Sequence, residues 1–76
     1  VENYLESVLK SSSIINRAIH MLSKIGYDTR NIRNNQLRQI KLIKAYQMHY
    51  RQRLVSGNLD FETYRIIQSH FNEILT

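Results

Sequence analysis

The sequence contains no proline and only two glycines, Gly26 and Gly57, and this scarcity limits the fold more than any other feature of the 76-residue chain. Proline interrupts helices, whereas glycine often stands just past a helix C-terminus because it accepts a left-handed backbone conformation without a steric penalty. β-Branched residues do not alternate with polar ones in runs of period two, so the sequence does not indicate strands. We therefore expect an all-α fold in which the two glycines separate three helical segments.

The first segment, residues 3–25, carries one stripe whose spacings alternate between four and three residues, as on one face of a helix. Three consecutive serines, at positions 11 to 13, interrupt the composition of the stripe but not its phase. We expect one continuous helix here. The alternative is two collinear helices, the second capped by Ser12 or Ser13, which would give a bundle of four. The stripe consists of Tyr4, Val8, Ser11, Ile15, Ala18, Leu22 and Ile25.

The second segment runs from about Thr29 to Ser56, and Asp28 or Thr29 is the expected N-cap. As one helix it would be about 40 Å long. Its expected core face, at a helical period, consists of Ile32, Ile43, Tyr46, Tyr50 and Leu54, with Ile40 at the edge.

The third segment has the clearest local signals. Gly57 is expected to end the second helix, and Asp60 to cap the third. Leu59 and Tyr64 have the spacing of a hydrophobic staple, and Glu62 lies in the first turn, where the helix dipole favours a negative charge. The expected buried face is Tyr64, Ile67, Phe71 and Ile74.

Short turns at residues 26–28 and 57–59 favour antiparallel neighbours. We therefore expect a single helical domain over residues 1–76: an antiparallel three-helix bundle with two long helices and a shorter C-terminal one. So short a chain buries only about 60% of its unfolded surface. We expect it to be a fragment of a larger protein or a homodimer, either of which would complete the burial.

An acid-free block at residues 29–59 contains seven lysines and arginines and no aspartate or glutamate. The acidic residues all lie outside the block, where the charges nearly cancel. The positive charge of the block therefore exceeds the net charge of the whole chain, which is +5. A localised positive field indicates an acidic or anionic partner. The cations are Arg30, Arg33, Arg38, Lys41, Lys44, Arg51 and Arg53.

Catalytic and metal-binding patterns are not found in the sequence. The histidines, His20, His49 and His70, fall on three different segments, each without a second ligand one turn away, and there is no cysteine. The carboxylates are scattered, and no glycine-rich phosphate loop or nucleophile motif occurs. We expect a protein that is not an enzyme, with no catalytic residue, metal or cofactor.

No apolar run reaches the roughly 20 residues that span a bilayer, and the first residues do not resemble a secretory signal. The lack of cysteine fits a reducing compartment. We expect an intracellular protein, cytoplasmic or nuclear, that does not act on membranes.

Apolar residues Leu37, Met48 and Val55 stand among the cations at spacings of eleven and seven, and so form a line on the basic face of the 29–56 helix. An exposed apolar line bordered by charge is typical of a protein contact. We therefore predict an interaction or oligomerisation module of a nucleic-acid-associated protein, which binds an acidic or amphipathic partner or a second copy of itself. Alternatively, the first helix covers this line. The predicted interface is Leu37, Met48, Val55, Arg38, Lys41 and Lys44.

Direct binding of DNA or RNA phosphates by the same basic face is the alternative function. Asn34 and Gln52 border this face and could contact base edges. Tyr46 and Tyr50 could stack on bases, although core packing is the stronger expectation for both. The predicted nucleic-acid-binding residues are Arg30, Arg33, Lys41, Lys44, Arg51, Asn34 and Gln52.

Overall fold

The computed structural model describes residues 7–32 and 35–75, and its regular elements are three helices. They are α1 (Ser12–Ile25), α2 (Gln36–Tyr50) and α3 (Phe61–Leu75). Within these described ranges no strand occurs, only an isolated antiparallel bridge between Val8 and Asp60. The prediction of an all-α fold is confirmed.

Helix α1 begins at Ser12, so the prediction of a helix that includes residues 7–11 is wrong. These residues pair with the chain just before α3: the Leu9 amide donates to the Leu59 carbonyl (2.8 Å), and the Phe61 amide donates to the Ser7 carbonyl (3.0 Å). Backbone groups that a helix would have used are therefore satisfied by a distant segment. The beginning of the predicted helix, with Tyr4, lies outside the described residues.

The N-cap of α1 is Ser11 rather than Ser12 or Ser13, and its side chain caps no backbone amide. Its hydroxyl instead lies 3.1 Å from that of Ser13. At the other end, Gly26 has φ +127°, and its amide donates to the Leu22 carbonyl at 3.1 Å. The prediction that this glycine ends the first helix is confirmed.

Helix α2 is much shorter than predicted, because its 15 residues span about 22 Å. Its N-cap is Asn35, whose side-chain oxygen accepts from the Arg38 amide at 3.1 Å, so the expected caps Asp28 and Thr29 are wrong. The backbone at Asn31 is left-handed, with φ 62°, which breaks any helix through this stretch.

Gly57 does not end α2, which already stops at Tyr50. It lies in the connection 51–60, with φ +80°, where the chain turns back against α2. A Cβ atom at this position would come within 2.8 Å of Ile40 Cγ2. The glycine is therefore needed both for its conformation and for its close approach to the helix.

Helix α3 begins as predicted. The Asp60 carboxylate accepts from the Thr63 amide at 2.9 Å, and Glu62 lies in the first turn. Ile67 is fully buried, and Tyr64 and Phe71 are partly buried against the core. Ile74 was expected on this buried face but is largely exposed, near the C-terminal end of the helix.

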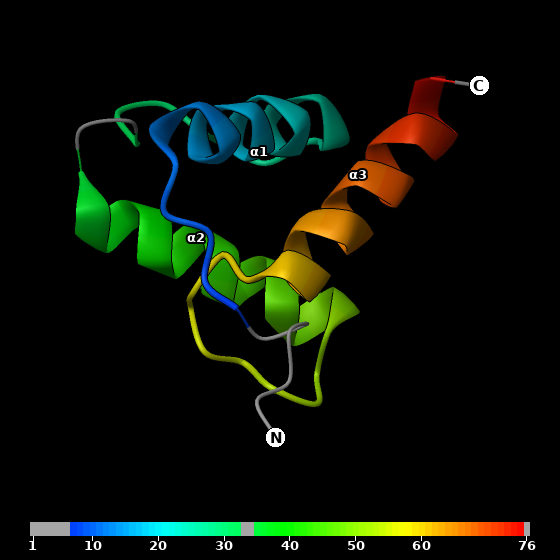
Figure 1. Ribbon diagram of the computed structural model, residues 1–76. Coiled ribbons are helices and arrows are strands. Elements are labelled where there is room, and N and C mark those ends of the chain that lie inside the picture. Colours follow the sequence, from blue (N-terminus) through cyan, green and yellow to red (C-terminus); the bar gives the residue numbers. More distant parts are fainter. Residues whose placement is uncertain (1–6, 33–34, 76) are drawn as a thin grey trace.

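The antiparallel bundle is not confirmed. In Figure 1, α1 and α2 run in the same direction across the view, and the connection between them returns along the length of α1. Helix α3 rises steeply from the end of α2 and packs against α1. The long connection removes the constraint that a tight turn would have placed on the first two helices. The core is Ala18, Ile19, Met21, Leu22, Ile32, Leu42, Ile43, Tyr46, Leu59 and Ile67.

Candidate protein-interaction surface

Four residues, Leu37, Lys41, Lys44 and Met48, make up the outward face of α2. Eleven residues bring Met48 back to within about 20° of Leu37 around the axis and about 16 Å along it. Leu37 is 73% exposed and Met48 59% exposed, and both lysines between them are exposed. The alternative in which α1 covers this line is therefore wrong. Helix α2 contains no acidic residue.

Two other residues of the predicted interface lie beside this face. Arg38 is exposed and lies next to Leu37 in the first turn of α2. Together with Asp28 and Arg30 it lines a hollow of about 250 Å³. Val55 lies in the connection 51–60 and is half-buried. Because α2 ends at Tyr50, the helical spacing that placed Val55 on the same line does not apply.

Arg51 was predicted to contact phosphates, and its position is a correction: the residue is only 4% exposed. Its guanidinium forms a buried ion pair with the Asp60 carboxylate, and Nη2 also donates to Thr63 Oγ1 at 2.8 Å. Glu62 Oε1 lies 3.5 Å from Nε. A guanidinium held in this way inside the protein is not available to a nucleic acid.

Gln47 extends the network around Arg51. Its side-chain nitrogen donates to the Asn58 carbonyl and to Thr63 Oγ1, both at 3.0 Å, and its side-chain oxygen accepts from the Gly57 amide at 2.8 Å. These bonds fix the connection 51–60 between the end of α2 and the start of α3. We did not predict this network. The available signal was that Gln47 and Arg51 lie four residues apart on the buried side of the helix.

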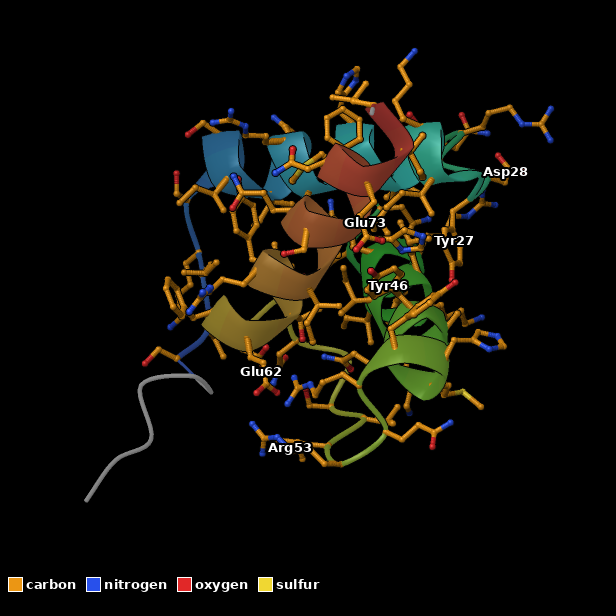
Figure 2. All side chains as sticks on the ribbon, turned by 90° about the vertical axis from the view of Figure 1, so that its right-hand side faces the viewer. Tyr27, Asp28, Tyr46, Arg53, Glu62 and Glu73 are labelled. Atoms are coloured by element: carbon orange, nitrogen blue, oxygen red, sulfur yellow. The ribbon has the colours of Figure 1, made fainter. Side chains whose placement is uncertain are left out.

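Ion pairs also reduce the free charge of the acid-free block 29–59. Arg30 is exposed but forms a salt bridge with Asp28, with 3.0 Å between Nη2 and Oδ2. Its hydrogen bonds lower the pKa of Asp28 to about 2, and the pKa of Arg30 is raised in return. Arg53 pairs with Glu62 at 2.9 Å; in Figure 2, Glu62 lies at the start of α3 and Arg53 lies below it on the connection 51–60.

Of the remaining residues predicted to contact nucleic acid, some are exposed and others lie outside the described residues. Gln52 is exposed, and its side-chain nitrogen donates to the Met48 carbonyl at 3.1 Å. Arg33 and Asn34 lie outside the described residues. Of the predicted cations, only Lys41 and Lys44 are on the outward face of α2.

Both Tyr46 and Tyr50 were expected in the core; this is confirmed for Tyr46 and wrong for Tyr50, which is 48% exposed. Tyr46 is fully buried, its hydroxyl lies 3.2 Å from His70 Nδ1, and burial raises its pKa. Its ring packs against Tyr27 and Tyr50 with centroid distances of 5.8 and 4.7 Å. Tyr50 is partly exposed and lines an open cleft of about 600 Å³ between α2 and α3, which Glu73 also lines. Figure 2 shows Glu73 beside the Tyr27 and Tyr46 cluster.

Comparisons with known proteins give no relative: no family model, curated protein or solved structure matches the chain. Across the part of the chain that the structure describes, no helix is long and apolar enough to cross a membrane. The same residues contain no group of three histidine or acidic side chains that could hold a metal ion.

Proposed function

We propose that the protein is a non-enzymatic interaction module that binds an acidic, amphipathic segment of another protein through the outward face of α2. One observation carries the proposal: Leu37 and Met48 are both well exposed on a helix face that also presents two lysines and has no acidic residue. Large apolar side chains bordered by charge are typical of protein contacts.

The charge of this face favours an acidic partner over a second copy. A symmetric dimer would bring the same patch of both copies together, so Lys41 and Lys44 would approach their own equivalents. Like charges at such a contact disfavour it, whereas a partner with carboxylates at the rim would gain from the field. An amphipathic helix supplies apolar side chains at the required separation of about 16 Å when they are eleven residues apart.

A designed helical peptide tests the proposal. It carries two leucines eleven residues apart, with glutamates beside them, and its binding is measured by fluorescence anisotropy at about 150 mM salt. We expect Met48→Glu or Leu37→Glu to weaken binding by about tenfold or more, because an apolar contact is replaced by a charge that repels the peptide.

The matched control is Ile74→Glu, which makes the same change at an exposed apolar residue of α3. This variant is expected to bind the peptide like the wild type. Equal losses in the control and the α2 variants, or no binding by the wild-type protein, would contradict the proposal. Circular dichroism spectra of all three variants establish that the helices persist.

Direct binding of nucleic acid is the second candidate function, because the exposed residues Arg30, Arg38 and Lys41 line one hollow, and the exposed Lys44 lies one turn of α2 beyond Lys41. Arg51 is buried and Arg30 is paired with Asp28, so Arg38, Lys41 and Lys44 remain, and about three phosphate contacts would give a log–log salt slope near −3 on duplex DNA. Titration of a DNA duplex at about 50 and 200 mM salt measures this slope. Binding that does not depend on salt, or no binding, excludes this candidate.

A further inference from the structure

A second concave site lies away from the outward face of α2, between residues 8–10, α1, the first half of α2 and residues 57–59. Its volume is about 340 Å³. Ligand pockets in proteins usually measure about 300 to 1,000 Å³ and are mostly apolar with a few polar groups at fixed places. The proposed function does not use this groove.

The lining of the groove is aliphatic. Nine of its described lining residues are alanine, valine, leucine or isoleucine, with Ile15 and Ile19 from α1 and Ile40 and Ile43 from α2, and none of the described lining residues is aromatic. Ile40 and Val8 are exposed although they are apolar. Such a surface favours a flexible hydrocarbon chain over a planar ring, because an aliphatic wall offers burial without a stacking partner.

The polar residues of the groove select the head of such a chain. Among the described residues that line the groove, Lys10 is the one with a charge, and the other polar side chains are the amides of Gln36, Gln39 and Asn58. None of these described lining residues is a carboxylate. The site therefore matches an anionic head group and disfavours a cationic one.

Two backbone contacts position the walls of the groove. The Leu9 amide donates to the Leu59 carbonyl at 2.8 Å, and the backbone of Gly57 closely approaches Ile40. We propose that this groove binds a single-chain aliphatic carboxylate of the fatty-acid type, with the chain along the aliphatic wall and the carboxylate at Lys10. A binding site prepared in this way avoids the entropy loss of ordering the protein.

Titration of the isotope-labelled protein with dodecanoate below its micelle concentration, followed by amide NMR shifts, tests the site. We expect saturable one-to-one binding, with the largest shifts at groove residues such as Ala18, Ile40 and Gly57. Dodecylammonium has the same chain with the opposite charge and is expected to bind at least tenfold more weakly. Equal binding of the two probes, or shifts centred on the cleft between α2 and α3, would overturn the proposal.

Two variants refine the test. Ile40→Glu places a carboxylate in the groove and is expected to abolish dodecanoate binding, while Ile74→Glu on α3 retains it. Lys10→Glu changes an exposed residue, so this variant is expected to fold like the wild type. It is expected to bind dodecylammonium more tightly than dodecanoate, the reverse of the wild-type protein. Unchanged preference in Lys10→Glu refutes the assigned head-group site. Sedimentation with phosphatidylglycerol vesicles separates the remaining case: binding to vesicles without binding of free dodecanoate would also refute the proposal.

Discussion

At the scale of single residues, the position of Arg51 changes the interpretation most. In the sequence it is one more cation of a basic block, yet its side chain is buried against Asp60 and Thr63. Two of its guanidinium nitrogens, Nε and Nη1, are buried without a hydrogen-bond partner within the described residues. Such a guanidinium depends on its ion pairs, the buried one with Asp60 and the longer one with Glu62, so removing a partner has a large effect.

We expect Arg51→Ala to lower the free energy of unfolding by about 3 to 5 kcal/mol, because it leaves the buried carboxylate of Asp60 without its counter-charge. In so small a domain this change can abolish cooperative unfolding altogether. Urea denaturation followed by circular dichroism measures the effect. Arg30→Ala, which removes an exposed pair, serves as the control and is expected to change the urea midpoint far less. Equal shifts of the midpoint in the two variants would be inconsistent with a structural role for Arg51.

The exposed pair of Asp28 and Arg30 has a different signature, which depends on pH. Because the folded-state pKa of Asp28 is lowered from 3.8 to about 2, the stabilisation that it contributes is present above the ordinary value and is lost as the pH falls toward 2. Arg30→Gln is expected to return this pKa toward 3.8. Side-chain NMR titration of Asp28 in the two proteins measures the difference, and identical titration curves would show that Arg30 is not the cause.

At the scale of helices, the sequence predicted those helix ends that are determined by residues within the same turn. Gly26 and the Asp60 cap act within one turn of their helices, and both were predicted correctly. The start of α1 could not be predicted, because residues 7–11 keep the helical phase but pair with residues 59–61 instead. For α2, Asn35 competes as a cap with Asp28, and the sequence does not show which of them begins the helix.

The connection between α2 and α3 allows a sharper test of an element that we predicted wrongly. Gly57→Ala introduces a left-handed alanine and a contact with Ile40, so we expect a loss of about 1 to 3 kcal/mol of unfolding free energy. Part of this loss is expected to disappear in an Ile40→Ala background, where the opposing methyl group is missing. A double-mutant cycle by urea denaturation measures the coupling. Strictly additive effects would mean that the backbone conformation alone requires glycine.

At the scale of the whole molecule, the fold class could be predicted and the arrangement could not. Helical periodicity and the lack of proline were sufficient for an all-α chain. The orientation of the helices depends on the lengths of the connections between them. We predicted connections that are too short, because the first two helices were predicted to be longer than α1 and α2 are. The candidate surface could be predicted in part. Leu37 and Met48 have their predicted exposure, whereas Val55 is half-buried in the connection after α2 and Arg51 is buried against Asp60.

The described carboxylates lie away from the outward face of α2. Four carboxylates lie within the described residues: Asp28 and Glu62 pair with exposed arginines, Asp60 is buried, and Glu73 lies beside the cleft between α2 and α3. The outward face of α2 keeps its positive charge because no carboxylate shares that helix. An acidic partner would therefore meet a positive field that the carboxylates of the described residues do not neutralise.

The bridge between residues 7–9 and 59–61 also limits how the chain can be shortened for study. A fragment that begins with the first helical residue, Ser12, would contain all three helices, yet it would leave the Leu59 carbonyl and the Phe61 amide without their backbone partners. It would also lose Val8, Leu9 and Lys10 from one wall of the aliphatic groove. The minimal domain is thus larger than its helices, and its boundary is set by a segment that has no regular structure.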